Sequence, residues 1–239
     1  MNTNALIAGF LGFATSMVMM FWTLRNYTYP KVEKPLFDDR KAFGLFTIGL
    51  VIGIVVFSAQ SYFDLAFVLA ALLFALGEEA VKLIILNLPR FRNRIDTCFY
   101  GLALGLGIGS TIAFASAYYA MAFIETIKPF TMITIIILTF QLVLLHGSTG
   151  ATIGIGVARG SPGSMFAQAA LVHISYSLVL IPFYSLELGY GIFFFILAFL
   201  GLLLYYLYVH YRLIPSFVSD AIMKFETKES RNPTNKGRL

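Results

Sequence analysis

The feature that most constrains this chain is the recurrence of long apolar stretches along almost its whole length. The hydrocarbon core of a bilayer is roughly 30 Å thick, so a helix rising 1.5 Å per residue needs about 20 apolar residues to cross it. We therefore predict an all-α, polytopic membrane protein with seven transmembrane helices. The seven stretches lie at positions 4–24, 42–62, 65–88, 98–124, 130–157, 164–184 and 189–211.

Composition supports this fold class. Hydrophobic residues make up 59% of the chain and charged residues only 12%, whereas a soluble domain carries about 25% charge. The strands of a membrane barrel would alternate in polarity over about ten residues, which this chain does not do. The first stretch lacks a basic leader and is long enough to span, so we expect it to stay in the protein. We predict a seven-helix membrane domain at 1–214 and a polar tail at 215–239, disordered from Phe225 onward.

The positions of Lys and Arg predict the orientation. Lys82 lies inside a span and Lys128 lies in a loop on one side, while the other 15 basic residues lie in loops and the tail on the opposite side. The positive-inside rule assigns that side to the cytoplasm, so the N-terminus is outside and the C-terminus inside. The formal charge of +5 belongs to loops beside the membrane. It favours contact with membrane lipids, and nucleic acid is not an expected partner.

Small residues recur at helical spacing in two of the spans. Gly101, Gly105 and Gly109 are four residues apart, and so are Gly150 and Gly154. Such stripes let helix backbones approach closely in lipid. We interpret them as packing signals that also fix nearby polar groups.

For two further residues we predict only a structural role. The only cysteine, Cys98, has no partner for a disulfide and no metal-ligand spacing, and we expect it to be buried. His210 lies at a span end beside Arg212, and we expect an interfacial side chain that reaches towards water.

Ionisable residues inside the spans are the strongest functional signal, because each costs several kcal/mol in the membrane and usually serves a function or an internal pair. Counted from the basic ends of their helices, Glu78, His146 and His173 each lie roughly 15–20 Å deep. Three helices thus place these groups near the bilayer midplane, and we predict that they form one site. Its members are Glu78, Glu79 and Lys82 in the third span, His146 in the fifth and His173 in the sixth.

The third span predicts how its charges divide. Glu78 and Lys82 are four residues apart with the acid first, the favourable order for a helical ion pair. We predict that Lys82 pairs with Glu78. Glu79 points about 100° further round the helix and would be left to take up a proton or bind a metal ion. A buried ion pair that only fixes helix packing is the structural alternative.

These side chains suffice for hydrolysis of an amide. A glutamate can activate a water molecule that histidines steer, and the same groups can bind Zn²⁺. The chain has no His-Glu-x-x-His and no Gly-x-Ser-x-Gly sequence, and its one cysteine lies near the cytoplasmic border. A serine or cysteine nucleophile therefore has little support.

At these residues the chain resembles the PrsW family of intramembrane proteases, which are relatives of the CAAX prenyl proteases. The resemblance covers roughly residues 77–180. It rests on the Glu78-Glu79-x-x-Lys82 motif, Asp96, the segment 100–107, His146 and His173.

The resemblance implies a multi-pass protein of a prokaryotic cell membrane that cleaves a membrane-protein substrate. It implies that Glu78 or Glu79 is the general base and that His146 assists it or binds metal. His173 would bind metal or stabilise the oxyanion. A zinc ion, where one is used, would be held by Glu79, His146 and His173, and we expect the site to open towards the cytoplasmic half of the bilayer.

Two departures from the family pattern bear on the metal. The family has a further glutamate and an asparagine in the fourth helix, where this chain has Ile112 and Ala113. Relatives also have an asparagine four residues after the last histidine, where this chain has Ser177 as a shorter hydrogen-bond donor.

Two non-proteolytic interpretations stay open. The chain is also similar to the seven-helix scaffold subunit of gamma-secretase around His146 and His173, and there the protein would assemble with a partner subunit. A proton or ion transporter would use the same midplane groups, but no repeated motif relates the two halves of the chain. The double glutamate favours the enzyme.

Overall fold

The structure is a computed structural model that describes residues 3–63, 67–123, 128–185 and 188–231. Every regular element in these ranges is helical. The helices are α1 (Thr3–Gly9), a π-helical turn (Phe10–Ala14), α2 (Thr15–Leu24), α3 (Asp39–Gln60), α4 (Val68–Leu86), α5 (Thr97–Phe123), α6 (Pro129–Arg159), α7 (Pro162–Ser185), α8 (Leu188–Tyr208), a second π-helical turn (Val209–Leu213) and α9 (Ile214–Arg231).

Six helical segments of the described residues are long and apolar enough to cross a membrane, so the chain is a multi-pass membrane protein. They are Thr3–Leu24, Asp39–Gln60, Thr97–Phe123, Pro129–Arg159, Pro162–Ser185 and Tyr190–Lys224. The remaining predicted span, the third at 65–88, corresponds to α4. This helix has 19 residues but carries Glu78, Glu79 and Lys82 along its apolar length.

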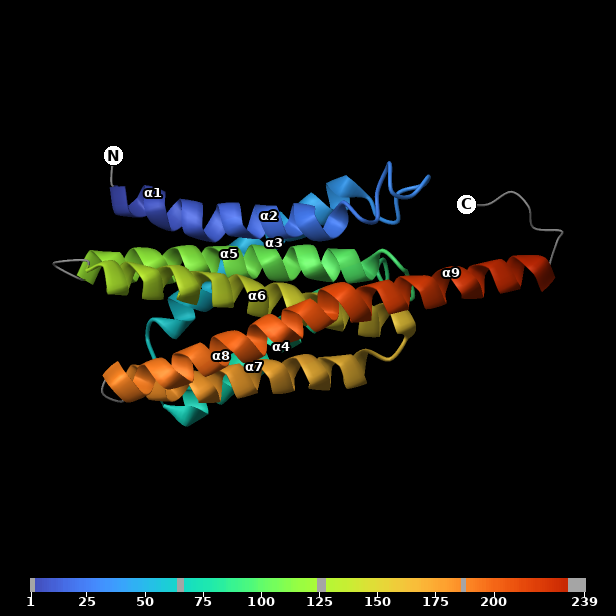
Figure 1. Cartoon of the computed structure of the whole chain (residues 1–239). Coiled ribbons are helices and arrows are strands. Elements are labelled where there is room, and N and C mark those ends of the chain that lie inside the picture. The colour runs from blue at the N-terminus through green and yellow to red at the C-terminus, as the bar shows by residue number, and fades with distance from the viewer. Residues whose placement is uncertain (1–2, 64–66, 124–127, 186–187, 232–239) are drawn as a thin grey trace.

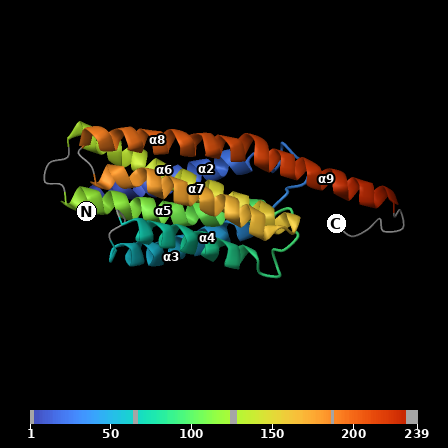
Figure 2. The ribbon, with the colours of Figure 1, turned by 90° about the horizontal axis from the view of Figure 1, so that it is seen from below.

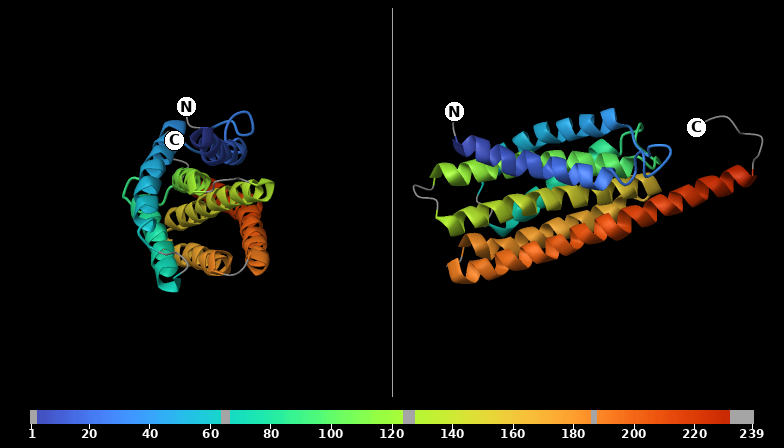
Figure 3. Two further views of the ribbon diagram at one scale, coloured as in Figure 1. Left: turned by 90° about the vertical axis from the view of Figure 1, so that its left-hand side faces the viewer. Right: turned by 45° about the horizontal axis from the view of Figure 1, so that its top comes forward.

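The helices lie roughly side by side in one bundle (Figure 1). The loops at 25–38 and 87–96, which hold many of the basic residues, lie at the same end. Viewed along the bundle, α3 and α4 form one side and α8 the opposite side, with α5 and α6 between them (Figure 3, left). Figure 2 shows the same separation of α3 and α8 from below.

The last helix differs from the sequence prediction. One helical segment, Tyr190–Lys224, runs for 35 residues, well beyond the predicted span end at 211. Its continuation α9 extends past the other helices at the basic end (Figure 1). Helix α9 continues to Arg231, so the expected disorder is wrong for residues 225–231. Residues 232–239 lie outside the described residues.

Helix α5 is the centre of the bundle. In its most apolar window 89% of the residues are buried, against 22–44% in the other five candidate spans. Glycines make this enclosure possible, because a Cβ added at Gly105 would lie on the carbonyl oxygen of His146 in α6. A Cβ at Gly107, on another face of α5, would lie on the carbonyl oxygen of Phe46 in α3. The predicted packing role of the glycines is therefore confirmed.

Local signals explain where the helices begin and end. The Asp38 side chain accepts a hydrogen bond from the backbone N–H of Arg40 at 2.9 Å and caps α3. Helix α6 starts at Pro129, and Gly160 follows its last residue with a φ of 76°. These boundaries set the depth at which α6 presents its polar residues.

His210 is not the interfacial side chain that we expected. It lies in the π-helical turn after α8 and is 6% exposed. Its Nδ1 lies 3.2 Å from the Thr23 hydroxyl of α2, and its ring stacks on Tyr206. The extra residue in the turn directs the imidazole into the bundle, where it connects the end of α8 to α2. Cys98 is buried, as expected.

Asp96 lies at the basic end of α5, where it holds the loop before the helix. It accepts two hydrogen bonds from Arg94, at 3.1 and 2.8 Å, which raise the pKa of the Arg94 guanidinium. The Tyr100 hydroxyl donates to Asp96 and accepts from the backbone N–H of Asp38. Tyr100, held by Asp96, therefore ties α5 to the N-cap of α3.

Candidate functional site

The five ionisable residues singled out in the sequence lie together where α4, α6 and α7 meet. Their side chains are buried, and Glu79 and Lys82 are completely so. The packing of α5 against α6 fixes the backbone position of His146, because Gly105 lets the two helices approach closely there. The structure thus brings together the groups that the sequence placed at one depth: Glu78, Glu79, Lys82, His146 and His173.

Glu79 is the carboxylate that Lys82 neutralises. The Lys82 ammonium lies 2.7 Å from Glu79 Oε1 and also donates to the Thr149 hydroxyl at 2.8 Å. The predicted pairing of Lys82 with Glu78 is therefore wrong. Positions i+3 and i+4 lie equally well within reach on a helix, and Thr149 of α6 draws the ammonium towards Glu79.

The same Glu79 oxygen also holds His173. The distance from His173 Nδ1 to Glu79 Oε1 is 2.7 Å. Because a carboxylate oxygen can only accept from Lys82 and the imidazole, Nδ1 carries the hydrogen. In the neutral form of the ring, Nε2 of His173 is then the nitrogen with a free lone pair.

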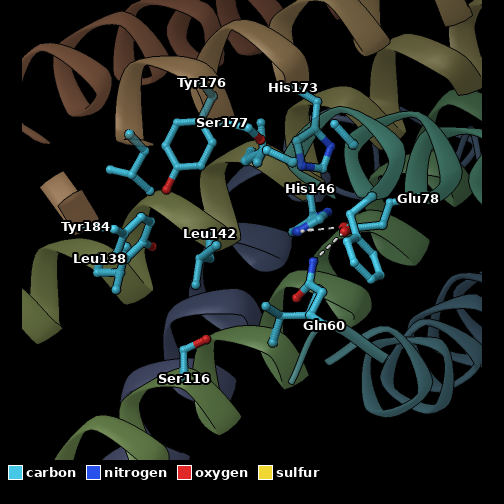
Figure 4. A pocket seen from close by; sticks show the side chains of 16 residues that line it. Gln60, Glu78, Ser116, Leu138, Leu142, His146, His173, Tyr176, Ser177 and Tyr184 are labelled. Carbon is cyan, nitrogen blue, oxygen red and sulfur yellow. Dashed lines mark hydrogen bonds and ion pairs between the residues drawn. The ribbon is translucent and has the colours of Figure 1, made fainter. Parts of the chain in front are cut away.

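Glu78 faces a different set of partners (Figure 4). Gln60, the last residue of α3, donates its amide to Glu78 Oε1 at 2.7 Å. His146 Nε2 lies 3.5 Å from Glu78 Oε2, and that oxygen has no hydrogen-bond partner in the structure. Glu79 Oε2 also lacks a hydrogen-bond partner, but of the two carboxylates only Glu78 borders a cavity.

Glu78 and the two histidines form a potential metal-binding group. One ligand atom from each of Glu78, His146 and His173 lies within 4.8 Å of the other two. The two imidazole rings are 5.3 Å apart and nearly perpendicular. The sequence-based ligand set named Glu79 in place of Glu78, and the ion pair with Lys82 explains the difference.

A cavity of about 100 Å³ borders this group. On α4, α6 and α7 most of the lining residues lie on the side of the site remote from the basic loops. They are Ala71, Phe74 and Ala75 on α4, Leu138 and Leu142 on α6, and Tyr176, Ser177, Leu180 and Tyr184 on α7.

The cavity therefore extends away from the basic end of the bundle. The expectation that the site opens towards the half of the bilayer that carries the basic loops is therefore wrong. Lys82, fully buried and bonded to Thr149, fills the space one turn towards the basic end. Polar groups also lie along the remote part of the cavity, where Figure 4 shows Ser116 and the hydroxyl of Tyr176.

The residues that depart from the family pattern lie at or near this cavity. Ile112 lines it, so the position where the family has a further glutamate is an apolar part of the wall. Ala113 is buried and does not line it. Ser177 lines the cavity and is half-buried.

Three polar residues at the site were missed by the sequence reasoning. Gln60 is at the end of an apolar span, Thr149 belongs to a glycine-rich run, and Tyr176 precedes Ser177. Tyr176 is 7% exposed and its hydroxyl has no hydrogen-bond partner. The available signal was spacing, since Thr149 lies three residues after His146 and Tyr176 three residues after His173.

The comparisons with known proteins leave the site to be interpreted from its geometry. No protein-family model, curated protein or solved structure matches this chain.

Proposed function

We propose that this chain is an intramembrane peptidase that resembles the PrsW family and hydrolyses peptide bonds of membrane-protein substrates. The proposal rests on one observation above the others. Glu79, neutralised by Lys82, holds His173 by its Nδ1, while Glu78 presents a free oxygen beside His146 and the cavity. A structural ion pair would need only the first half of this arrangement.

The two adjacent glutamates have separate roles in the proposal. Glu79 orients His173 through its 2.7 Å contact and is neutralised by Lys82. A carboxylate bonded to one imidazole nitrogen fixes the ring and strengthens the other nitrogen as an acceptor or ligand. Glu78 is then the general base, because it is not paired with Lys82 and lines the cavity, whereas Glu79 is paired with Lys82 and does not line it.

The reaction needs one water molecule and one peptide bond. Glu78 Oε2 takes a proton from water while the water oxygen attacks the carbonyl carbon of the substrate. Protonated Glu78 then delivers that proton to the amide nitrogen as the carbon–nitrogen bond breaks. His146, whose Nε2 lies 3.5 Å from Glu78 Oε2, is placed to stabilise the negative charge on the tetrahedral oxygen.

The residues present fit a zinc ion. Two imidazoles and one carboxylate within 4.8 Å of one another are the ligand types of open catalytic zinc sites. Glu78 Oε2 and His146 Nδ1 are buried polar atoms without hydrogen-bond partners, which a bound ion or water would satisfy. When bound there, zinc would supply Lewis-acid polarisation of the substrate carbonyl, with Glu78 and His146 as ligands in place of their roles in the metal-free reaction.

For topology we propose seven spans, with α4 as the third in chain order and the basic loops in the cytoplasm. Its three ionisable residues are all buried against other helices, which makes a short charged span tolerable. A prokaryotic cell membrane is the location that the resemblance to PrsW implies. In this orientation the cavity extends towards the outer half of the membrane.

Thiol labelling tests this topology. In a Cys98→Ala background, Ser116→Cys should react with a membrane-impermeant reagent added outside, and Ser148→Cys should not. Ser116 lines the cavity, whereas Ser148 is completely buried and does not. Labelling of Ser116→Cys only from the cytoplasmic side would contradict the proposed orientation.

Peptide cleavage by the purified protein tests the activity. Glu78→Gln and His146→Ala should each lower the rate by about 10²-fold or more, because each removes a general base or a charge-stabilising group. Glu33→Gln, in an exposed loop, is the matched control and should be active.

Two outcomes would contradict the proposal. Cleavage that survives Glu78→Gln together with Glu79→Gln would exclude the mechanism. A folded wild-type protein that cleaves no membrane-derived peptide, with or without zinc, would instead favour a scaffold like the gamma-secretase subunit. Loss of activity in a chelator, restored by Zn²⁺, would show that the reaction uses the metal.

A further inference from the structure

A second cavity lies at the basic end of the bundle, far along the chain from the residues of the candidate site. Its volume is about 660 Å³, and it lies between the C-terminal half of α2, the following loop and the first turns of α3. Figure 3, right, shows the loop that joins these two helices at the basic end. The buried residues Met20, Leu24 and Phe37 are part of its lining.

The cavity is divided into an apolar part and a charged part. Met17, Phe21 and Phe43 line the apolar part and are 41%, 67% and 50% exposed, so this wall faces the surroundings of the helices. Arg25 and Lys31 line the charged part. Met17 precedes Arg25 by two helical turns, a distance of about 12 Å along α2.

The charges that line this cavity are two cations and one anion: Arg25, Lys31 and Asp39. Within the described parts of the chain, Lys31 and Asp39 form no ion pair with another side chain. The Arg25 guanidinium lies 4.1 Å from the centre of the Trp22 ring. Tryptophan prefers the membrane–water interface, so this stack places the cation at the level of lipid head groups.

We propose that this cavity binds one glycerophospholipid whose head group carries a phosphate and a primary ammonium, as in phosphatidylethanolamine. Arg25 and Lys31 bind the phosphate, and the Asp39 carboxylate accepts hydrogen bonds from the ammonium. An acyl chain lies along Met17, Phe21 and Phe43. The assignment does not depend on peptidase activity.

The pattern of charges selects this head group over two common alternatives. Phosphatidylglycerol has the phosphate but no cation for Asp39, so it would leave that carboxylate without a partner. Phosphatidylcholine has a cation but no N–H to donate to Asp39. Only the primary ammonium satisfies the carboxylate by charge and hydrogen bonding together.

Native mass spectrometry of the full chain tests the proposal, using nanodiscs with equal amounts of phosphatidylethanolamine, phosphatidylglycerol and phosphatidylcholine. Wild-type protein should retain one phosphatidylethanolamine in preference to both others. Arg25→Gln and Lys31→Gln should each lower retention about tenfold, since each removes a charge-assisted hydrogen bond. Asp39→Asn should retain phosphatidylglycerol as well as phosphatidylethanolamine.

Lys34→Gln is the matched control, because Lys34 is exposed in the same loop but does not line the cavity. It should retain lipid as the wild type does. An equal loss in Lys34→Gln would show unspecific attraction to a basic loop and overturn the proposal. Equal retention of the three lipids by wild-type protein, or a preference for phosphatidylglycerol, would also overturn it.

Discussion

The two faces of α6 differ sharply. On the side towards α5, the two backbones are in close contact through glycine. A Cβ at Gly105 of α5 would lie on the backbone of His146. Towards α4 and α7, helix α6 carries the His146 imidazole, beside a carboxylate and a cavity of about 100 Å³. One residue thus has its backbone in the tightest contact of the bundle and its side chain in the polar site. A firmly held backbone is what keeps an imidazole in a fixed position next to open space.

The largest effect on folding should come from adding a side chain at the close contact between α5 and α6. Gly105→Leu should prevent correct folding, because the new Cβ meets backbone that has no freedom to move aside. Size-exclusion chromatography and thermal unfolding in detergent would measure it. Gly201→Ala, at a helical glycine where a Cβ meets nothing within 4 Å, is the control and should fold normally.

The next effect should come from the polar face. Lys82→Met leaves the Glu79 charge with only His173 in a fully buried position, and should lower the free energy of unfolding by about 3–5 kcal/mol. Adding Glu79→Gln to Lys82→Met should restore part of the loss, since no unpaired charge is then buried. Unchanged stability in Lys82→Met would contradict the ion pair.

Metal binding should have a somewhat smaller effect on stability. Zinc at about one hundred times its dissociation constant should stabilise the protein by about 2.7 kcal/mol if it binds only the folded state. His146→Ala should abolish this gain, while Glu79→Gln should weaken zinc affinity about 10- to 100-fold by releasing His173. Equal stabilisation of all three proteins would place the zinc elsewhere.

The smallest effect on stability should come from replacing a glycine that makes no close contact with another helix. Gly77 directly precedes the two glutamates, and a Cβ there meets nothing within 4 Å. Gly77→Ala should raise the free energy of unfolding by about 0.5–1 kcal/mol through helix propensity alone. A loss of stability would show that α4 needs the glycine for a contact absent from this structure.

The sequence predicted the membrane helices and the common depth of the ionisable residues because both depend on counting along one helix. It did not predict which glutamate pairs with Lys82, because that pairing depends on contacts with Thr149 and His173, which lie on two other helices. The direction of the cavity was missed for the same reason. The helical stretch at 225–231 was missed because a polar segment continuing a long helix has no apolar periodicity of its own.

The hydrogen bond from Lys82 to Thr149 has a consequence for the angular setting of α4. Adjacent residues on a helix differ by about 100° in azimuth, so a rotation of α4 by that angle about its own axis would bring Glu79 to the direction in which Glu78 now points. In lipid, hydrophobicity alone does little to fix the rotation of a helix about its axis, because the lipid tails are as apolar as the side chains that face them. The hydrogen bond from Lys82 to Thr149 fixes the rotation of α4 about its axis. It therefore also determines which of the two carboxylates faces the cavity.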